Sequence, residues 1–273
     1  MPLPSEESVM NDGFLARAPQ RDWAASFAQV FSGPASRVQA RVWREVMGDE
    51  YPETLDTFSY TTNTELERCV RDLALEPGGL MADIGCGRGG PGLWVAGRSG
   101  ARLIGLDIAD PALEAARHRA SNLGLGETSE FRLGSFEDTG LREAELDGVL
   151  SVDAFLFAPE KTAAAAELRR VLKPGARLVM TTWDYHRQPA GRPPQVPDHR
   201  PLLEAAGFTT LAYDDTPAWR ERQTHIGQLL VDAVPELAAE SGRPETEVRD
   251  GLEEMHATLD CMIRRVFIVA EAR

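Results

Sequence analysis

The 273-residue sequence is poor in cysteine, in basic residues and in long apolar runs, and each shortage excludes a class of protein. Cys69, Cys86 and Cys261 have neither metal-ligand spacing nor an even number, so we expect no metal site and a reducing, cytoplasmic location. There are 29 lysines and arginines against 43 aspartates and glutamates, and the net charge of −14 argues against a nucleic-acid partner. No apolar run reaches the ~18 residues of a membrane span, and we expect neither a span nor a signal peptide.

The sequence does contain a glycine-rich turn, MADIGCGRGGPG at residues 81–92. The apolar run in front of it predicts a buried parallel strand, and the residues after it predict a helix. Gly85, Gly87 and Gly89 permit a tight turn and a close approach of the main chain to a ligand. Asp83 would lie at the carboxyl end of the strand, which is the edge where open α/β sheets bind their ligands.

Two classes of nucleotide site use such a turn. Gly85, Gly87 and Gly90 satisfy the dinucleotide fingerprint, and Asp107, at the end of the next predicted strand, suits ribose hydroxyls in either class. An acid just before the glycines is unfavourable beside a pyrophosphate, but it suits the positively charged amino-acid end of S-adenosylmethionine. Asp83 therefore favours a site for S-adenosylmethionine over a dinucleotide site, and an NAD(P)-dependent oxidoreductase is the alternative.

The run DIGCGRG at residues 83–89 resembles motif I of the class I S-adenosylmethionine (SAM)-dependent methyltransferases, and Asp107 matches their ribose-binding acid. RRVLKPGARLVMTTW at residues 169–183 resembles a later motif of the same family. The resemblance implies SAM as the cofactor and an α/β, Rossmann-like class I methyltransferase fold. This fold has a seven-stranded, mostly parallel sheet with a reversed last hairpin, and here we expect an N-terminal helical lid and a C-terminal helical cap.

The expected domain organisation follows from this fold and from the helical periodicity. Thr62 and Glu65 form a capping box at the start of the helix that leads into the core, and Asp110 is expected to cap a later helix. In the cap, two helices are predicted at 218–234 and 245–262. The expected divisions are 1–62, a lid with mobile first residues; 63–216, the SAM-binding core; 217–263, a cap for the acceptor; and 264–273, the last core strand.

On the resemblance, the cofactor would lie along the carboxyl ends of the first four strands. Motif I would hold the methionine end, Asp107 the ribose, and the loop after the third strand the adenine. Many relatives carry an acid where Ser135 stands, so its contact to the adenine amino group is open, whereas Phe136 would pack on the ring. The predicted cofactor-binding residues are Asp83, Gly85, Cys86, Gly87, Gly89, Asp107, Ile108, Gly134, Ser135, Phe136 and Ser151.

The predicted fourth strand, residues 146–157, ends where the family places the methyl donor beside the acceptor. Asp153 is predicted either to cap the following turn or to act as a catalytic residue that contacts SAM or helps to orient the acceptor. Some relatives place a basic histidine shortly after this strand, and apolar residues stand there in this chain. The residues predicted to line the acceptor site are Tyr51, Tyr60, Phe155, Phe157, Trp183, Tyr185 and His225, with Phe58 as a further candidate.

His186 follows the fifth predicted strand and is the candidate general base, because a neutral imidazole accepts a proton near neutral pH. An exposed loop histidine is the alternative interpretation. The sequence as a whole predicts a methyltransferase acting on a small, partly apolar acceptor, of natural-product type, with O-methylation slightly favoured over N- or C-methylation. A SAM-fold protein that catalyses a non-methylating step such as cyclisation is a further alternative, and homo-oligomers are compatible with the sequence.

Overall fold

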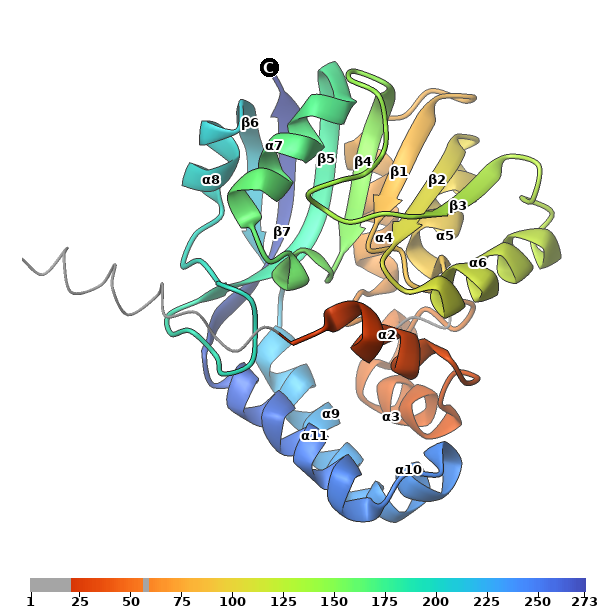
Figure 1. The fold of residues 1–273 in the computed structure, drawn as a ribbon, viewed down its shortest axis with the longest axis vertical. Coiled ribbons are helices and arrows are strands. Elements are labelled where there is room, and N and C mark those ends of the chain that lie inside the picture. The colour runs from red at the N-terminus through yellow and green to blue at the C-terminus, as the bar shows by residue number, and fades with distance from the viewer. Residues whose placement is uncertain (1–20, 56–58) are drawn as a thin grey trace, which may run out of the picture.

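The computed structural model describes residues 21–55 and 59–273 (Figure 1). The predictions for the first residues of the chain and for Phe58 lie outside these ranges. Within them, no helix is both long and apolar enough to cross a membrane.

One mixed sheet forms the centre of the described chain, in the strand order β3-β2-β1-β4-β5-β7-β6. The strands from β3 to β5 are parallel, and β7 is antiparallel to both β5 and β6. The expected fold with its reversed last hairpin is therefore confirmed. The strands are β1 (Leu80–Ile84), β2 (Arg102–Asp107), β3 (Ser129–Leu133), β4 (Leu146–Val152), β5 (Leu172–Tyr185), β6 (Phe208–Asp215) and β7 (Met262–Ala272).

Helices cover both faces of the sheet, and the central strands contribute mostly apolar residues to the core on each face. Helices α7 and α8 pack with Leu168 and Leu203 into the core of one face. Helices α4, α5 and α6 bury residues such as Leu73, Leu93 and Leu113 in the core of the other face. Their bounds are α4 (Asn63–Leu73), α5 (Gly90–Ser99), α6 (Asp110–Asn122), α7 (Lys161–Val171) and α8 (Arg200–Ala205).

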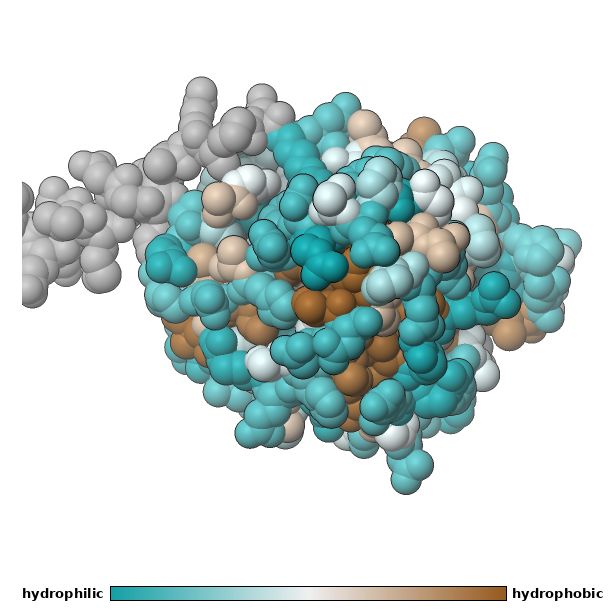
Figure 2. Space-filling view, turned by 90° about the horizontal axis from the view of Figure 1, so that it is seen from below, coloured by the Kyte–Doolittle hydropathy of each residue, from teal (hydrophilic) through white to brown (hydrophobic). Residues whose placement is uncertain are grey.

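A second group of helices lies beyond the carboxyl ends of the parallel strands (Figure 1). Helix α2 crosses next to this edge of the sheet, and the other helices pack around an apolar cluster of their own that includes Val42, Ile226 and Leu252. From below, apolar residues are visible between the polar helix surfaces (Figure 2). The bounds are α2 (Trp23–Phe31), α3 (Arg37–Met47), α9 (Trp219–Asp232), α10 (Val234–Ser241) and α11 (Glu245–Leu259).

Several predicted boundaries were wrong. The cap has three helices where two were predicted: α9 stops at Asp232, and a new helix, α10, starts with Pro235 in its first turn, because proline has no N–H for a continuing helix. Asp110 is the first residue of α6, whose N-cap is Ala109 without a side-chain hydrogen bond. The fourth strand ends at Val152.

Two further differences concern the strands beside the site. Residues Phe155–Phe157, predicted as part of the fourth strand, form a 3-10 helix. Strand β5 begins at Leu172 and includes the predicted break at residues 173–175, which the sheet accommodates by a register shift against β4. The capping box of Thr62 and Glu65 is confirmed in both directions.

Candidate functional site

The loop between β1 and α5 turns tightly at the carboxyl edge of the sheet. Gly85, Gly87 and Gly89 have φ angles of 75°, 52° and 75°, in the left-handed region that L side chains rarely adopt. A Cβ on Gly85 would lie 2.4 Å from the Cβ of Ala154, so this position also has no room for a side chain. At this edge of the sheet, the three glycines of the loop therefore present main-chain atoms and no side chains.

Two carboxylates lie directly under this loop. Asp107, at the end of β2, accepts main-chain hydrogen bonds from Gly87 (2.8 Å) and Ala109 (2.9 Å) and is 7% exposed. Asp83, at the end of β1, is 1% exposed, and its Oδ2 has no hydrogen-bond partner in the described chain. A Cβ on Gly92 would lie 2.5 Å from that oxygen, so the glycine in the first turn of α5 makes space for the carboxylate.

The electrostatics of these two acids favour a cationic ligand. The pKa of Asp83 is raised to about 7, chiefly by burial; the N–H of Gly92 opposes the shift, and the charge of the neighbouring Asp107 adds to it. Burial likewise raises the pKa of Asp107 against three main-chain N–H groups. No ion pair to either acid is found within residues 21–55 and 59–273. A positively charged group at this edge would stabilise both ionised carboxylates.

Helix α2 covers the glycine loop with a row of aromatic rings. Trp23, Phe27 and Phe31 are four residues apart, and their adjacent ring centroids are 5.9 and 6.0 Å apart. At one end, a Cβ on Gly87 would lie 3.5 Å from the Phe31 ring. At the other end, Trp23 contacts Phe157 at 4.9 Å. The row thus connects the loop to the 3-10 helix after β4.

A buried ion network lies at the end of β4. Asp153 has a φ of 54°, and its carboxylate accepts hydrogen bonds from Arg265 Nε (3.0 Å), Thr181 Oγ1 (2.7 Å) and the main-chain N–H of Tyr60 (2.8 Å). Arg265 is 0% exposed and donates a second hydrogen bond to Glu65. Asp153 is therefore held by partners from β7, β5 and the segment before α4, and a guanidinium neutralises it.

The comparisons with known proteins agree with this geometry. The family model for the methyltransferase domain matches residues 82–180, which run from β1 through the glycine loop to β5. Residues 82–180 are therefore similar to a methyltransferase domain, and the strand order is that of the class I SAM-dependent methyltransferase fold. SAM is the cofactor of this class of domain, and the buried acids fit the ammonium group of its methionine end.

Three similar proteins illustrate the range of the fold. The 24-methylenesterol C-methyltransferase 2 of Oryza sativa subsp. japonica is 34% identical over 122 residues, 45% of this chain and 34% of that protein. The structure of the [4+2]-cyclase SpnF matches with a TM-score of 0.70 and 18% identity, covering 93% of this chain and 97% of that one. Geranyl diphosphate C-methyltransferase from Streptomyces coelicolor A3(2) has a TM-score of 0.65 and 16% identity, covering 94% of this chain and all of that one.

The matches with the curated relatives cover less than half of each relative's length. The chain spans 28% to 46% of the length of the first curated relatives that it matches. The matched solved structures share the fold of this chain over most of its length.

The residues predicted beside the adenine lie together at the ends of β2 and β3. Phe136 is 8% exposed and packs edge-on against Phe155, with ring centroids 5.4 Å apart. Ser135 Oγ accepts the N–H groups of Glu137 (3.2 Å) and Asp138 (3.1 Å), which fixes this turn of the methyltransferase domain. Ile108 and Gly134, the other residues predicted here, are half-buried in the same two loops.

Two other residues predicted to contact the cofactor point into the protein. The Cys86 side chain is 5% exposed and belongs to the core that α4, α5 and α6 cover, so this residue offers the site its main chain. Ser151 is 0% exposed, and its hydroxyl donates to the main-chain oxygen of Ile84 at 2.9 Å. It therefore links β4 to β1 inside the sheet.

The aromatic residues predicted for the acceptor site divide into two sets. Trp183, Tyr185, Tyr60 and Phe157 come together in one cluster between the end of β5, α11 and the 3-10 helix. Tyr51 packs into the apolar cluster of the cap, and Phe155 is a fully buried core residue beside Phe136. The sequence identified these aromatic residues, whereas the structure shows which of them share a location.

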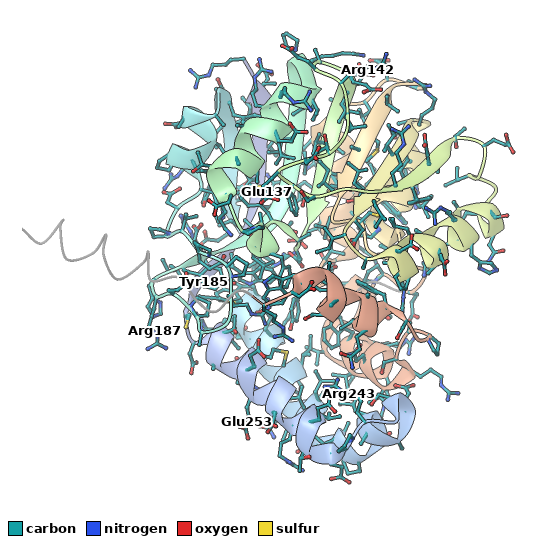
Figure 3. The ribbon with its side chains drawn as sticks, viewed as in Figure 1. Glu137, Arg142, Tyr185, Arg187, Arg243 and Glu253 are labelled. Atoms are coloured by element: carbon teal, nitrogen blue, oxygen red, sulfur yellow. The ribbon has the colours of Figure 1, made fainter. Side chains whose placement is uncertain are left out.

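The predicted histidines lie at the surface. His186 is exposed, and its main-chain N–H donates to Cys261. Its neighbours are labelled in Figure 3: Tyr185 lies among the side chains between the sheet and the cap, whereas Arg187 projects outward. His225 is exposed on α9.

The sequence did not indicate a second histidine, His199, which is buried near the end of β5. His199 is 0% exposed, and its Nδ1 lies 2.9 Å from Asp184 Oδ1, which also accepts hydrogen bonds from Tyr213 (2.6 Å). Arg264 Nε donates to the other oxygen of Asp184 at 2.8 Å. Burial lowers the pKa of His199 against the opposing effect of Asp184. The available signal was Asp184 itself, a charged residue at the end of an apolar strand, which requires buried partners.

Proposed function

We propose that the chain transfers the methyl group of SAM to a small, partly apolar acceptor. The observation that carries this proposal is the pair of buried acids, Asp83 and Asp107, under a glycine loop with no cationic partner in the described chain. The acids suit the ammonium and ribose hydroxyls of SAM, and they disfavour the diphosphate of a dinucleotide. When bound, SAM would supply a methyl group on a sulfonium centre: the acceptor atom would attack the methyl carbon in line, and S-adenosylhomocysteine would leave.

In this proposal the chain's own residues bind, orient and exclude water. The glycine loop and Asp83 hold the methionine end, Asp107 holds the ribose, and Phe136 packs on the adenine. Helix α2 acts as the lid of residues 1–62, because its aromatic row covers the loop. The helices of residues 217–263 form the acceptor cap, and residues 63–216 with 264–273 form the core. Alignment of the acceptor and exclusion of water supply most of the acceleration.

In this proposal neither Asp153 nor His186 acts as a strong general base. Arg265 neutralises Asp153, and His186 is exposed beyond the cluster of Trp183 and Tyr185. We propose that Asp153 anchors the end of β4 and the lid segment at Tyr60, in place of accepting a proton. The acceptor atom is then one that reacts without a strong base.

The names of the relatives bear on which acceptor atom is methylated, for which the sequence slightly favours oxygen. Several curated relatives are named as sterol C-methyltransferases and one as a tocopherol O-methyltransferase, so carbon joins oxygen as a candidate atom. All of these names describe partly apolar acceptors. The aromatic cluster of Trp183, Tyr60 and Phe157 is consistent with such a molecule, including one of natural-product type.

Calorimetry and mass spectrometry test the proposal. We expect the protein to bind S-adenosylhomocysteine, and to add 14 Da, the mass of CH2, to an acceptor from a panel of phenols, terpenoids and sterols; fragmentation then locates the methyl on oxygen, nitrogen or carbon. Stabilisation by NAD(P) in place of S-adenosylhomocysteine would show an oxidoreductase. The likeness to the [4+2]-cyclase SpnF motivates one more arm, in which acceptors are examined for isomerisation without a change in mass.

A further inference from the structure

The cluster between β5, α11 and α2 contains three hydrogen-bond donors without acceptors. Tyr185 Oη, Trp183 Nε1 and Arg192 Nε have no hydrogen-bond partner within the described ranges. Tyr185 is 0% exposed and Trp183 is 3% exposed. A buried donor without an acceptor costs free energy unless a ligand or water satisfies it, so these groups indicate a binding function.

Arg192 lies among aromatic rings with little negative charge beside it. Its guanidinium carbon is 5.2 Å from the centroid of Trp23 and 5.3 Å from that of Phe157. Within the described chain, Arg192 forms an ion pair with Glu254 at 3.7 Å. Both oxygens of Glu254 accept closer hydrogen bonds from Arg21. Burial lowers the pKa of Arg192, and the negative charge of Glu254 opposes this shift without cancelling it.

The three donors belong to one location. Trp183 and Tyr185 share a cluster at the end of β5, where Figure 3 shows Tyr185 directed into the space between the sheet and the cap. The Arg192 guanidinium carbon lies 5.3 Å from the ring of Phe157, and Phe157 belongs to the same cluster as Trp183, Tyr185 and Tyr60. Tyr60 in turn packs edge-on against Trp183 at 6.0 Å.

We infer that Arg192, with Tyr185 and Trp183, recognises an anionic oxygen group on the acceptor, a carboxylate or a phosphate. This inference rests on the proposed function and adds the chemical class of the acceptor. An Arg guanidinium and neutral donors bind such a group by charge-assisted hydrogen bonds, and the surrounding rings bind the apolar remainder.

The position of the group relative to the cofactor loop gives the orientation of the acceptor. Trp23 contacts Arg192, and Phe31, eight residues further along α2, contacts Gly87. Eight residues of helix span about 12 Å. The anionic end therefore lies away from the glycine loop, and the apolar part of the molecule extends along α2 towards the methyl donor.

Calorimetry on the protein saturated with S-adenosylhomocysteine tests this inference with four compounds of one carbon skeleton: cinnamate, cinnamamide, cinnamyl phosphate and cinnamyl alcohol. At least one anion should bind about tenfold or more tightly than its neutral counterpart. The anion that binds more tightly distinguishes a carboxylate from a phosphate. Arg192→Gln should remove this preference and leave the neutral compounds unchanged, whereas Arg192→Lys should keep part of it.

Two further arms separate recognition from structure. Glu254→Gln should retain the anion preference, because Glu254 does not contribute a donor; an equal loss in this variant and in Arg192→Gln would show that Arg192 only fastens the helices. Equal affinities for anions and neutral compounds in the parent protein, or no anion binding at millimolar concentration, would also overturn the inference. Binding of S-adenosylhomocysteine by each variant is measured first, so a failure of the proposed function is recognised separately.

Discussion

The two sides of the candidate site differ in how they are built and in their charge. The cofactor side is made mostly of main chain from one stretch of sequence, the end of β1, the glycine loop and the end of β2, and its buried charges are the carboxylates of Asp83 and Asp107. The proposed acceptor side is made of side chains from distant segments, and two arginines, the half-buried Arg192 and the fully buried Arg265, are its prominent charges.

This difference in charge has a functional meaning. SAM brings positive charge to the side that has unpaired acids, and a partly buried guanidinium on the other side suits a negative group on the acceptor. The ion network of Asp153, Arg265 and Glu65 lies between the two sides and keeps its own charges paired. The two sides should therefore respond separately to substitution, and the following variants measure how separate they are.

The largest effect is expected where the two sides meet. Arg265→Met leaves Asp153 and Glu65 buried without their guanidinium, which should lower the free energy of unfolding by about 3–5 kcal/mol. Urea unfolding followed by circular dichroism measures the loss. Arg142→Met is the control, because its ion pair with Glu145 is at the surface and its loss should change the stability little. Similar losses in the two variants would contradict the role of the network.

The next largest effect concerns the cofactor side alone. Asp107→Asn should weaken S-adenosylhomocysteine binding about 100-fold, because charge-assisted hydrogen bonds to the ribose are lost. Asp147→Asn is the matched control: Asp147 also accepts a main-chain N–H, from Leu80 at 2.9 Å, but at the opposite end of the sheet. Calorimetry should show unchanged cofactor affinity in the control. A loss in both variants would mean that general destabilisation explains the result.

How much of this was predictable follows from the same contrast. The glycine turn, Asp107 and the capping box of Thr62 and Glu65 depend on neighbours in sequence, and motif spacing predicted their placement in the fold. The sequence did not show which of the motif residues turn their side chains towards the cofactor. The side chains of Ser151 and Cys86 point into the protein, and the alternation of residues along a strand does not reveal this from one sequence.

The acceptor side was predicted less well because its contacts cross the chain. Arg265 reaches Asp153, 112 residues away, and Glu65, 200 residues away. A single sequence has no signal for such pairs beyond the presence of a charge in an apolar strand, which was available in the RRVFIVAEA segment. Arg192 stands in a proline-rich loop, where no periodicity indicates which side chains turn inward.

A pH dependence should also belong to the cofactor side. With the pKa of Asp83 at about 7 in the free protein, the ammonium of the cofactor must displace a proton below that pH. SAM affinity should therefore rise about fivefold from pH 6 to pH 7 and level off above, with close to one proton released at pH 6. Calorimetry in buffers of different ionisation enthalpy counts the proton.

The sign for stability is the opposite one. Because the folded pKa of Asp83 is raised above its unfolded value near 3.9, the free protein is stabilised below pH 4 by this group, and the contribution is lost as the pH rises through about 7. Asp83→Asn should remove the proton release and flatten both profiles. Proton release that persists in this variant would assign the titration to another group and would separate Asp83 from the cofactor.

The smallest expected effect tests whether α2 serves both sides. Phe27 stacks on Phe31 at 6.0 Å and meets the Phe157 ring edge-on at 4.8 Å, so Phe27→Ala breaks the aromatic row at its middle. Aromatic pairs contribute about 0.5–1.5 kcal/mol each, so the acceptor KM should rise about three- to tenfold, while the affinity for S-adenosylhomocysteine changes less than about twofold. Val30→Ala, on the exposed face of the same helix with 46% of Val30 accessible, controls for the loss of an apolar side chain from α2. If both substitutions change cofactor affinity as strongly as acceptor KM, then α2 covers the cofactor side and the acceptor side as one unit, and the two sides do not respond separately at this helix.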